Sequence, residues 1–250
     1  MATPTSRFFF IHVMKTAGTT LSRHLQQQFP PAEFYPSRGF DSESVTDYEA
    51  YVSVPRLRVL PDARRDQVRM YSGHFPYMAA ALVAPDLRVI TLLRDPVDRT
   101  ESVLKHFKRL DDRFRASTLE EIYEHPQISR SYIRNYQTKI FSFVPADEAD
   151  TVLRPLAVDA ARLQLAKDNL EQVEFIGLTE GFGELVEELR TVLGWWPDGV
   201  DSNDRANKSP EAWSISPALR QRIADDNAHD VDFYRYAQDL VARRRAARGR

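Results

Sequence analysis

Short apolar runs alternate with segments of helical periodicity in the first half of this chain. Residues 8–13 form a continuous apolar and aromatic run that contains one histidine, and residues 87–93 form a second run. Runs of this length are typical of strands that are buried on both faces of a sheet. From Gly18 to Pro30, apolar residues recur at every fourth position, which predicts a helix with one buried face.

The pattern between these runs and after them predicts further elements. Residues 68–72 predict a short strand that breaks at Gly73 and is followed by a helix. Pro96 suits the first turn of a helix that continues to about Leu110. The later elements are expected in this order: a helical region over 118–141 interrupted near Pro126, a helix over 157–171, a strand over 173–178, a helix ending at Gly194, and two helices at about 217–228 and 230–246.

Strands that alternate with helices indicate βαβ units. The predicted fold class is therefore α/β, with a P-loop-like parallel sheet flanked by helices on both faces. Ligands of such sheets bind beyond the carboxyl ends of the strands. The segments that come directly after the runs at 8–13, 68–72 and 87–93 should therefore converge in space.

Composition places the chain among ordinary globular proteins. We expect one domain over residues 1–250, because 42% of the residues are hydrophobic and 28% are charged. A net charge of -2 argues against a nucleic-acid partner. The lack of cysteine excludes disulfides, thiolate zinc sites and a cysteine nucleophile. No apolar run is long enough to span a bilayer and the first residues do not form a signal peptide, so we expect a cytoplasmic protein.

The segment "KTAGTT", residues 15–20, lies where the first predicted strand meets the first predicted helix. A helix N-terminus presents unpaired N–H groups and partial positive charge to an anion. Lys15 adds a full charge, the three threonines add hydroxyl donors, and Gly18 permits close backbone approach. The segment indicates an anion site; a capped turn without a ligand is the alternative. Compared with the triphosphate loop G-x-x-x-x-G-K-[ST], it lacks the first glycine and the lysine, which indicates fewer phosphate charges.

The run at 87–93 ends in Arg94, where a kinase or ATPase usually carries a metal-binding carboxylate. A guanidinium binds phosphate with two parallel hydrogen bonds and repels a metal ion. Ser102 lies about two turns into the following helix and can donate to the same group, with Arg99 one turn before it. The alternative is a structural ion pair between Arg94 and Asp95 or Asp98.

Three of these segments together resemble the sulfotransferases that use 3′-phosphoadenosine 5′-phosphosulfate (PAPS), in the branch of the heparan sulfate 2-O-sulfotransferases and their bacterial relatives. "FIHVMKTAGTTL" (10–21) resembles the 5′-phosphosulfate loop, with Met14 in place of the usual proline. "RDPVDRTESV" (94–103) resembles the 3′-phosphate motif, and "YSGHF" (71–75) resembles the segment that carries the catalytic histidine. Weaker likenesses extend the resemblance to about residue 241: "NYQTKIF", "EFIGLTEGF", "NKSP" and "DVDFYRYAQDLV".

The resemblance implies a PAPS-dependent O-sulfotransferase that releases adenosine 3′,5′-bisphosphate (PAP) and needs no metal. The acceptor would be a hydroxyl of a carbohydrate, glycolipid or small metabolite. His74 would be the general base, although a hydrogen-bonded buried histidine or a helix-cap contact is the alternative. Lys15 would stabilise the leaving oxygen. The residues expected to bind PAPS are Lys15, Thr16, Ala17, Gly18, Thr19, Thr20, Arg94, Ser102 and Lys208, the last of which could equally be a solvated loop charge.

The motifs also predict which regions of the chain form each part of the site. The core strands and nucleotide site should occupy about 7–110 and 170–195, the acceptor side about 30–65 and 108–150, and the C-terminal helices 213–247. The remaining expectations are these: His12 packed beneath the site; His106 complementing its helix dipole; Asn135, Gln137 and Lys139 either lining the acceptor site or exposed; Trp195, Trp196 and Trp213 in the core or a lid; and the last arginines at a solvated helix end.

Two other functions fit the same segments. A P-loop phosphotransferase acting on a small molecule would require magnesium and a carboxylate near the loop. A non-catalytic nucleotide-binding protein would be expected to lose Lys15 or the base, and both are present.

Overall fold

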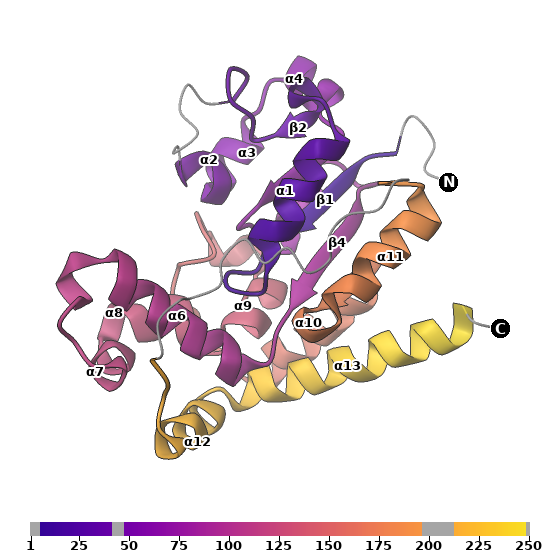
Figure 1. The fold of residues 1–250 in the computed structure, drawn as a ribbon. Coiled ribbons are helices and arrows are strands. Elements are labelled where there is room, and N and C mark those ends of the chain that lie inside the picture. The colour runs from indigo at the N-terminus through magenta and orange to yellow at the C-terminus, as the bar shows by residue number, and fades with distance from the viewer. Residues whose placement is uncertain (1–5, 42–47, 197–212, 249–250) are drawn as a thin grey trace.

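The computed structural model describes residues 6–41, 48–196 and 213–248. Its centre is a five-stranded sheet in the order β2-β3-β1-β4-β5, in which every neighbouring pair is parallel (Figure 1). The predicted α/β class, a parallel sheet flanked by helices, is confirmed. The strands are β1 (Phe8–Ile11), β2 (Phe34–Tyr35), β3 (Met70–Gly73), β4 (Arg88–Leu93) and β5 (Phe175–Leu178).

Helices connect these strands and account for most of the remaining described chain. The α-helices are α1 (Gly18–Gln28), α2 (Tyr48–Val52), α3 (Val54–Arg58), α4 (Asp62–Gln67), α5 (Met78–Val83), α6 (Pro96–Leu110), α7 (Leu119–Glu124), α8 (Pro126–Ile128), α9 (Tyr136–Ser142), α10 (Ala160–Glu171), α11 (Phe182–Leu193), α12 (Pro217–Asp226) and α13 (Ala228–Arg248). A π-helical segment, η3 (Ser129–Ile133), and the 3₁₀ turns η1 (Pro31–Glu33), η2 (Asp112–Phe114), η4 (Pro145–Asp147) and η5 (Thr179–Gly181) complete the elements.

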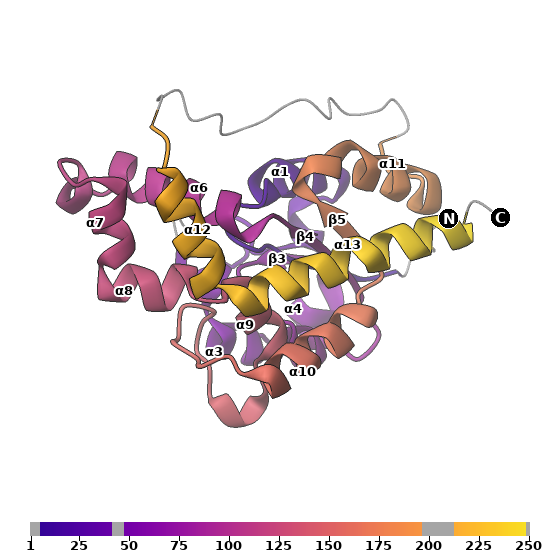
Figure 2. The same ribbon diagram turned by 90° about the horizontal axis from the view of Figure 1, so that it is seen from below.

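The strand β1 shows how the apolar run produces the layers. All four of its side chains are fully buried, and successive residues of a strand point to opposite faces. Phe9 and Ile11 join a core with α5, α9, α10 and α13, whereas Phe8 and Phe10 join a core with α1 and α11. Figure 2 shows α1 and α11 on one side of the sheet and α9 and α10 on the other. Trp195 and Trp196 belong to the second core, as expected.

Helix α6 begins where the sequence predicts it. Asp95 accepts hydrogen bonds from the backbone N–H groups of Val97 and Asp98, and Pro96 occupies the first turn. This cap fixes the direction in which α6 leaves the end of β4. The helix packs in a third apolar cluster with α7, α8 and α12, beside the sheet rather than on either face.

The structure corrects the predicted boundaries at a few places. The first strand ends at Ile11, so His12 and Val13 already belong to the following loop. The region 30–65, where the sequence pattern predicts no elements, contains the short edge strand β2 and the helices α2, α3 and α4. The helical region at 118–141 is interrupted at Pro126, as predicted, and Gly194 ends α11 with a φ of 71°.

The described arginines near the C-terminus contact neighbouring helices, while Arg243 and Arg248 are also exposed to solvent as expected. Arg244 donates to the carbonyl oxygen atoms of Glu171 and Val173, each at 2.6 Å. Arg245 and Arg248 form ion pairs with Glu184 and Glu188 of α11. Helix α13 is therefore fastened along its length to α10 and α11. Within the described ranges, no helix has both the length and the apolar composition needed to cross a membrane.

At its other end α13 carries a buried carboxylate. Asp230 accepts hydrogen bonds from the backbone N–H groups of Gln137 and Thr138 at 3.1 and 2.7 Å, and from the Thr138 hydroxyl at 2.7 Å. Burial raises the pKa of Asp230, while the positive charge of Arg99 opposes that rise. Both Asp230 and Arg99 are 1% exposed, and each charge favours the ionised form of the other in the interior.

Replacement of Asp230 by alanine should therefore cost about 3–5 kcal/mol of unfolding free energy, because it leaves three donors without their acceptor and removes the negative charge that favours the buried Arg99 guanidinium. Urea denaturation of the purified variant measures this loss. Asp232→Ala is the matched control, because Asp232 lies on the same helix and pairs with the exposed Arg235. Equal stability of the two variants would contradict the role given to Asp230.

Candidate active site

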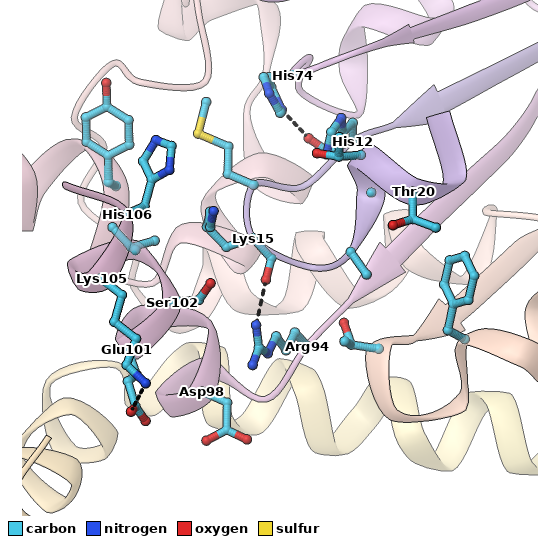
Figure 3. Close-up of a pocket in the computed structure, with 18 of the residues that line it drawn as sticks. His12, Lys15, Thr20, His74, Arg94, Asp98, Glu101, Ser102, Lys105 and His106 are labelled. Atoms are coloured by element: carbon cyan, nitrogen blue, oxygen red, sulfur yellow. Dashed lines mark hydrogen bonds and ion pairs between the residues drawn. The ribbon is translucent and has the colours of Figure 1, made fainter. Parts of the chain in front are cut away.

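A cavity of about 1270 Å³ opens at the carboxyl ends of β1, β3 and β4. It exceeds the usual range of about 300–1000 Å³ for a single small-molecule site, which leaves room for two ligands side by side. Its walls come from the β1–α1 loop, the end of β3, one face of α6 and the β5–α11 segment, and Figure 3 shows side chains from these walls around Lys15. The three predicted segments therefore do converge.

The β1–α1 loop has a strained backbone. Lys15 and Ala17 have positive φ values of 67° and 68°, which cost free energy in residues with a side chain. Gly18 does not supply this conformation; a Cβ there would lie 2.1 Å from Cδ2 of the His12 ring. Gly18 thus makes room for His12, whereas the sequence was interpreted as allowing approach of a ligand.

The hydroxyl groups of the loop divide between structure and cavity. Thr16 is fully buried, and its Oγ1 donates to the Val13 carbonyl at 2.9 Å. Contrary to the expectation, its side chain therefore does not line the cavity. Lys15, Ala17, Gly18, Thr19 and Thr20 do line the cavity. Helix α1 begins at Gly18 without a side-chain cap, so the first N–H groups of the helix have no side-chain acceptor.

Arg94 joins the two predicted anion-binding segments. Its Nη1 donates to the carbonyl oxygen of Lys15 at 3.2 Å, and both side chains face the same cavity (Figure 3). The alternative ion pairs with Asp95 and Asp98 are not formed: Asp95 caps α6, and Asp98 binds Arg220 at 2.8 Å. Ser102 lies on the cavity-facing side of α6.

Positive charge is concentrated around Lys15. Burial lowers the pKa of Lys15 to about 8, and the neighbouring charges of Arg109, Arg94 and Arg99 contribute to the shift in that order. Most molecules still carry the proton at neutral pH, so the charge is held against a cost in desolvation and repulsion. A bound anion would relieve both, which makes this part of the cavity suited to phosphate or sulfate groups.

The acidic side chains of the cavity wall are already paired. Glu101 binds Lys105 at 2.8 Å and also binds Arg220, the partner of Asp98. Glu180 accepts from the Tyr234 hydroxyl, and Glu184 pairs with Arg245. In the part of the chain that the structure describes, no three histidine or acidic side chains gather as a metal site would require.

His74 lies directly after β3 at the edge of the cavity. Its Nδ1 lies 2.6 Å from the carbonyl oxygen of His12, and its backbone N–H donates to the Tyr51 carbonyl. Because a carbonyl can only accept, Nδ1 carries the proton and Nε2 keeps its lone pair. Burial lowers the pKa of His74 to about 4; the hydrogen bond to His12 raises it and the charge of Lys15 lowers it. His74 is therefore neutral at pH 7, as a base must be before reaction.

Two histidines differ from their expected roles. His12 lines the cavity instead of packing beneath it, and its ring centroid lies 4.4 Å from that of His74. Burial, His74 and Lys15 lower the pKa of His12 well below its ordinary value. His106 also lines the cavity, and burial with the charges of Lys15 and Arg109 lowers its pKa to about 4. His106 therefore forms part of the cavity wall, and its lowered pKa does not favour the charged form that a helix dipole would stabilise.

Asn135, Gln137 and Lys139 neither line the cavity nor lie exposed on the surface. Gln137 accepts from the backbone N–H of Arg94 at 3.0 Å and donates to its carbonyl at 2.8 Å. Asn135 accepts from the backbone N–H of Asp230 at 3.1 Å. Lys139 donates to the Ser131 carbonyl at 2.9 Å, and burial lowers its pKa to about 7. The side chains of these three residues therefore support the backbone behind the cavity wall.

Several residues of the site were not predicted. Thr179 donates to the carbonyl oxygen atoms of Thr16 and Leu93 at 3.0 and 3.1 Å, which ties the loop to the end of β4. Lys105, His106 and Arg109 share the cavity-facing side of α6 with Ser102. Their spacing of three, four and seven residues from Ser102 was the available signal. Lys208 lies outside the described residues.

Comparisons with known proteins give little further information. No family model matches the chain, and no curated protein matches it. Among solved structures, a sulfotransferase from Alicyclobacillus acidocaldarius is similar to this chain at 21% sequence identity, with a TM-score of 0.47 and coverage of 97% of each chain. Similarity at this level does not establish a shared activity.

Proposed function

We propose that the protein is an O-sulfotransferase that moves the sulfuryl group of PAPS to an acceptor hydroxyl and releases PAP. The observation that carries this proposal is the hydrogen bond of 3.2 Å between Arg94 Nη1 and the Lys15 carbonyl. It joins two cationic segments, each resembling a different phosphate motif of the sulfotransferases, within one cavity that also contains the neutral His74. The comparisons do not test this assignment.

The residues present fit a donor with two anionic ends. Lys15 and the N-terminus of α1 suit the 5′-phosphosulfate, because they offer a cation and the positive end of a helix dipole. Arg94 and Ser102 suit the 3′-phosphate. Arg99 instead supports the backbone inside the protein, where it donates to the carbonyl oxygen atoms of Tyr132 at 2.6 Å and of Met14 at 3.5 Å.

The chemistry assigned to the side chains follows from their charge. Lys15 stabilises the negative charge that grows on the 5′-phosphate oxygen as it leaves, and such stabilisation acts mainly in the transition state. His74 accepts the acceptor proton at Nε2, while its Nδ1–H remains bonded to His12. A magnesium-dependent phosphotransferase would need a carboxylate available near the loop. The described carboxylates of the wall are instead engaged with Arg220, Lys105, Tyr234 and Arg245.

Calorimetry with PAP tests the donor assignment. Wild-type protein should bind PAP equally well with magnesium and with a chelator. Arg94→Ala should weaken binding about 10- to 100-fold, because charge-assisted hydrogen bonds contribute roughly 1.5–3 kcal/mol. Arg88→Ala is the control, since Arg88 begins the same strand and pairs with Glu174 outside the cavity. Binding of ATP with magnesium in preference to PAP would favour the phosphotransferase.

The role of His74 is tested by turnover. His74→Asn should lower kcat by roughly 10²- to 10⁴-fold while PAP affinity stays near that of the wild type, because general-base catalysis contributes that much. Radiolabelled transfer from PAPS measures the rate. His229→Asn, a change on α13 away from the cavity wall, should leave it unaltered. A His74→Asn enzyme with wild-type turnover would exclude this histidine as the base.

The pKa of Lys15 predicts how PAP binding depends on pH. The lowered value of about 8 means that the free protein loses this proton as the pH rises through 8. PAP affinity should therefore be constant between about pH 6 and 7.5 and fall about tenfold per unit above 8. Lys15→Arg should abolish this decline, since a guanidinium stays charged. An identical alkaline decline in both proteins would show that another group titrates.

A further inference from the structure

Aromatic rings wall the part of the cavity around His74. The Tyr48 ring lies 6.1 Å from the His74 ring, and the Phe107 ring lies 5.0 Å from that of Tyr132, centroid to centroid. His106 lies 5.9 Å from Phe107, and Figure 3 shows His106 and His74 on the same side of Lys15. A ligand beside His74 therefore meets flat, largely apolar surfaces.

The polar groups that this cavity offers a ligand are mainly cations, hydroxyl groups and imidazoles, with few free hydrogen-bond acceptors. The described lining residues include no asparagine or glutamine, and all four lining carboxylates are already engaged with basic or hydroxyl partners. Burial is the main cause of the raised pKa of Tyr132. A sugar brought here would lose water from several hydroxyl groups and find few replacements, and each unmet group costs about 1–3 kcal/mol.

Apolar side chains also lie at the cavity mouth. The described residues contain four exposed large hydrophobic side chains: Phe40, Tyr48, Val59 and Leu110. Two of them, Tyr48 at 49% and Leu110 at 63% exposure, line this cavity. An apolar part of a ligand that extended out of the cavity would cover these two side chains.

We infer that the acceptor is a phenol, with its hydroxyl at His74 and its ring between Tyr48 and the face of α6 formed by His106, Phe107 and Leu110. This inference rests on the proposed function. It specifies the chemical class of the acceptor, which the proposed function leaves open. Sugars and glycans, which the sequence resemblance favours, are the excluded class.

The reaction balances with the groups present. The phenolic O–H bond breaks and its proton goes to Nε2 of His74. A bond forms between the phenolic oxygen and sulfur, while the bond from sulfur to the 5′-phosphate oxygen breaks and leaves its electron pair on that oxygen, near Lys15. The products are an aryl sulfate and PAP.

Acidity favours a phenol over a sugar hydroxyl here. A phenol has a pKa of about 10, whereas an alkyl hydroxyl lies nearer to water at about 15.7. His74, with a pKa of about 4, is a weak base in the free protein. A weak base is best matched to the more acidic of the two hydroxyl types.

The test is transfer of radiolabel from PAPS to 2-naphthol and 4-nitrophenol, compared with N-acetylglucosamine, glucuronic acid and a heparosan oligosaccharide, with PAP calorimetry on the same protein. We expect kcat/KM for the phenols to exceed that for each sugar at least about 100-fold, which corresponds to two or more unmet hydroxyl groups.

Two surface variants locate the acceptor ring. Leu110→Asn should raise the KM for 2-naphthol roughly 3- to 10-fold with little change in kcat, because it removes apolar contact distant from the reacting atoms. Val59→Asn is its matched control, an exposed apolar residue outside the cavity, and should leave KM unchanged. Tyr48→Ala and Phe40→Ala form a second pair of the same design.

The outcomes separate the acceptor from the donor. Preferred transfer to sugars, or PAP binding without transfer to either phenol, would overturn the phenol and leave the donor site standing. Equal effects of Leu110→Asn and Val59→Asn would also overturn it. Absence of PAP binding would overturn the proposed function and the phenol together.

Discussion

Concentrated positive charge at the carboxyl edge of the sheet is the constraint around which this structure is organised. Lys15 and Arg94 meet there, and burial together with the charges of Arg109, Arg94 and Arg99 lowers the pKa of Lys15. The surrounding groups hold this arrangement in place: Gln137 grips the backbone of Arg94 on both sides. Charges fixed in this way before a ligand arrives need little reorganisation when negative charge develops.

Burial is the main cause of the neutral state of the histidines. It lowers the pKa of His12, His74 and His106, and the charge of Lys15 acts in the same direction on all three. One cluster of cations can thus attract an anion and also help to keep a nearby imidazole unprotonated. The close approach of His12 to the start of α1 depends on Gly18, the position where a Cβ would strike the ring.

The strands and the convergence of motifs could be predicted from the sequence because both arise from local rules. Buried strands produce apolar runs, and parallel topology brings the loops after those strands to one edge of the sheet. The role of Asp230 could not be predicted, since it depends on contacts between α13 and α9 across more than 90 positions. The role of Gln137 depends likewise on the fold, which brings its side chain to the backbone of Arg94, 43 positions away. His106 was misjudged because its charge state depends on Lys15 and Arg109, which only the folded chain brings near. The edge strand β2 is two residues long and leaves no periodic signal.

Helix α13 contacts the elements behind two walls of the cavity. Near its start, Asp230 holds the first turn of α9; one turn later, Tyr234 holds Glu180; and its final turns grip α11. The β5–α11 wall of the cavity and the wall behind Arg94 consequently share one support. Any exchange of this helix between related proteins has to satisfy two separate surfaces at once, which restricts how the end of the chain can diverge.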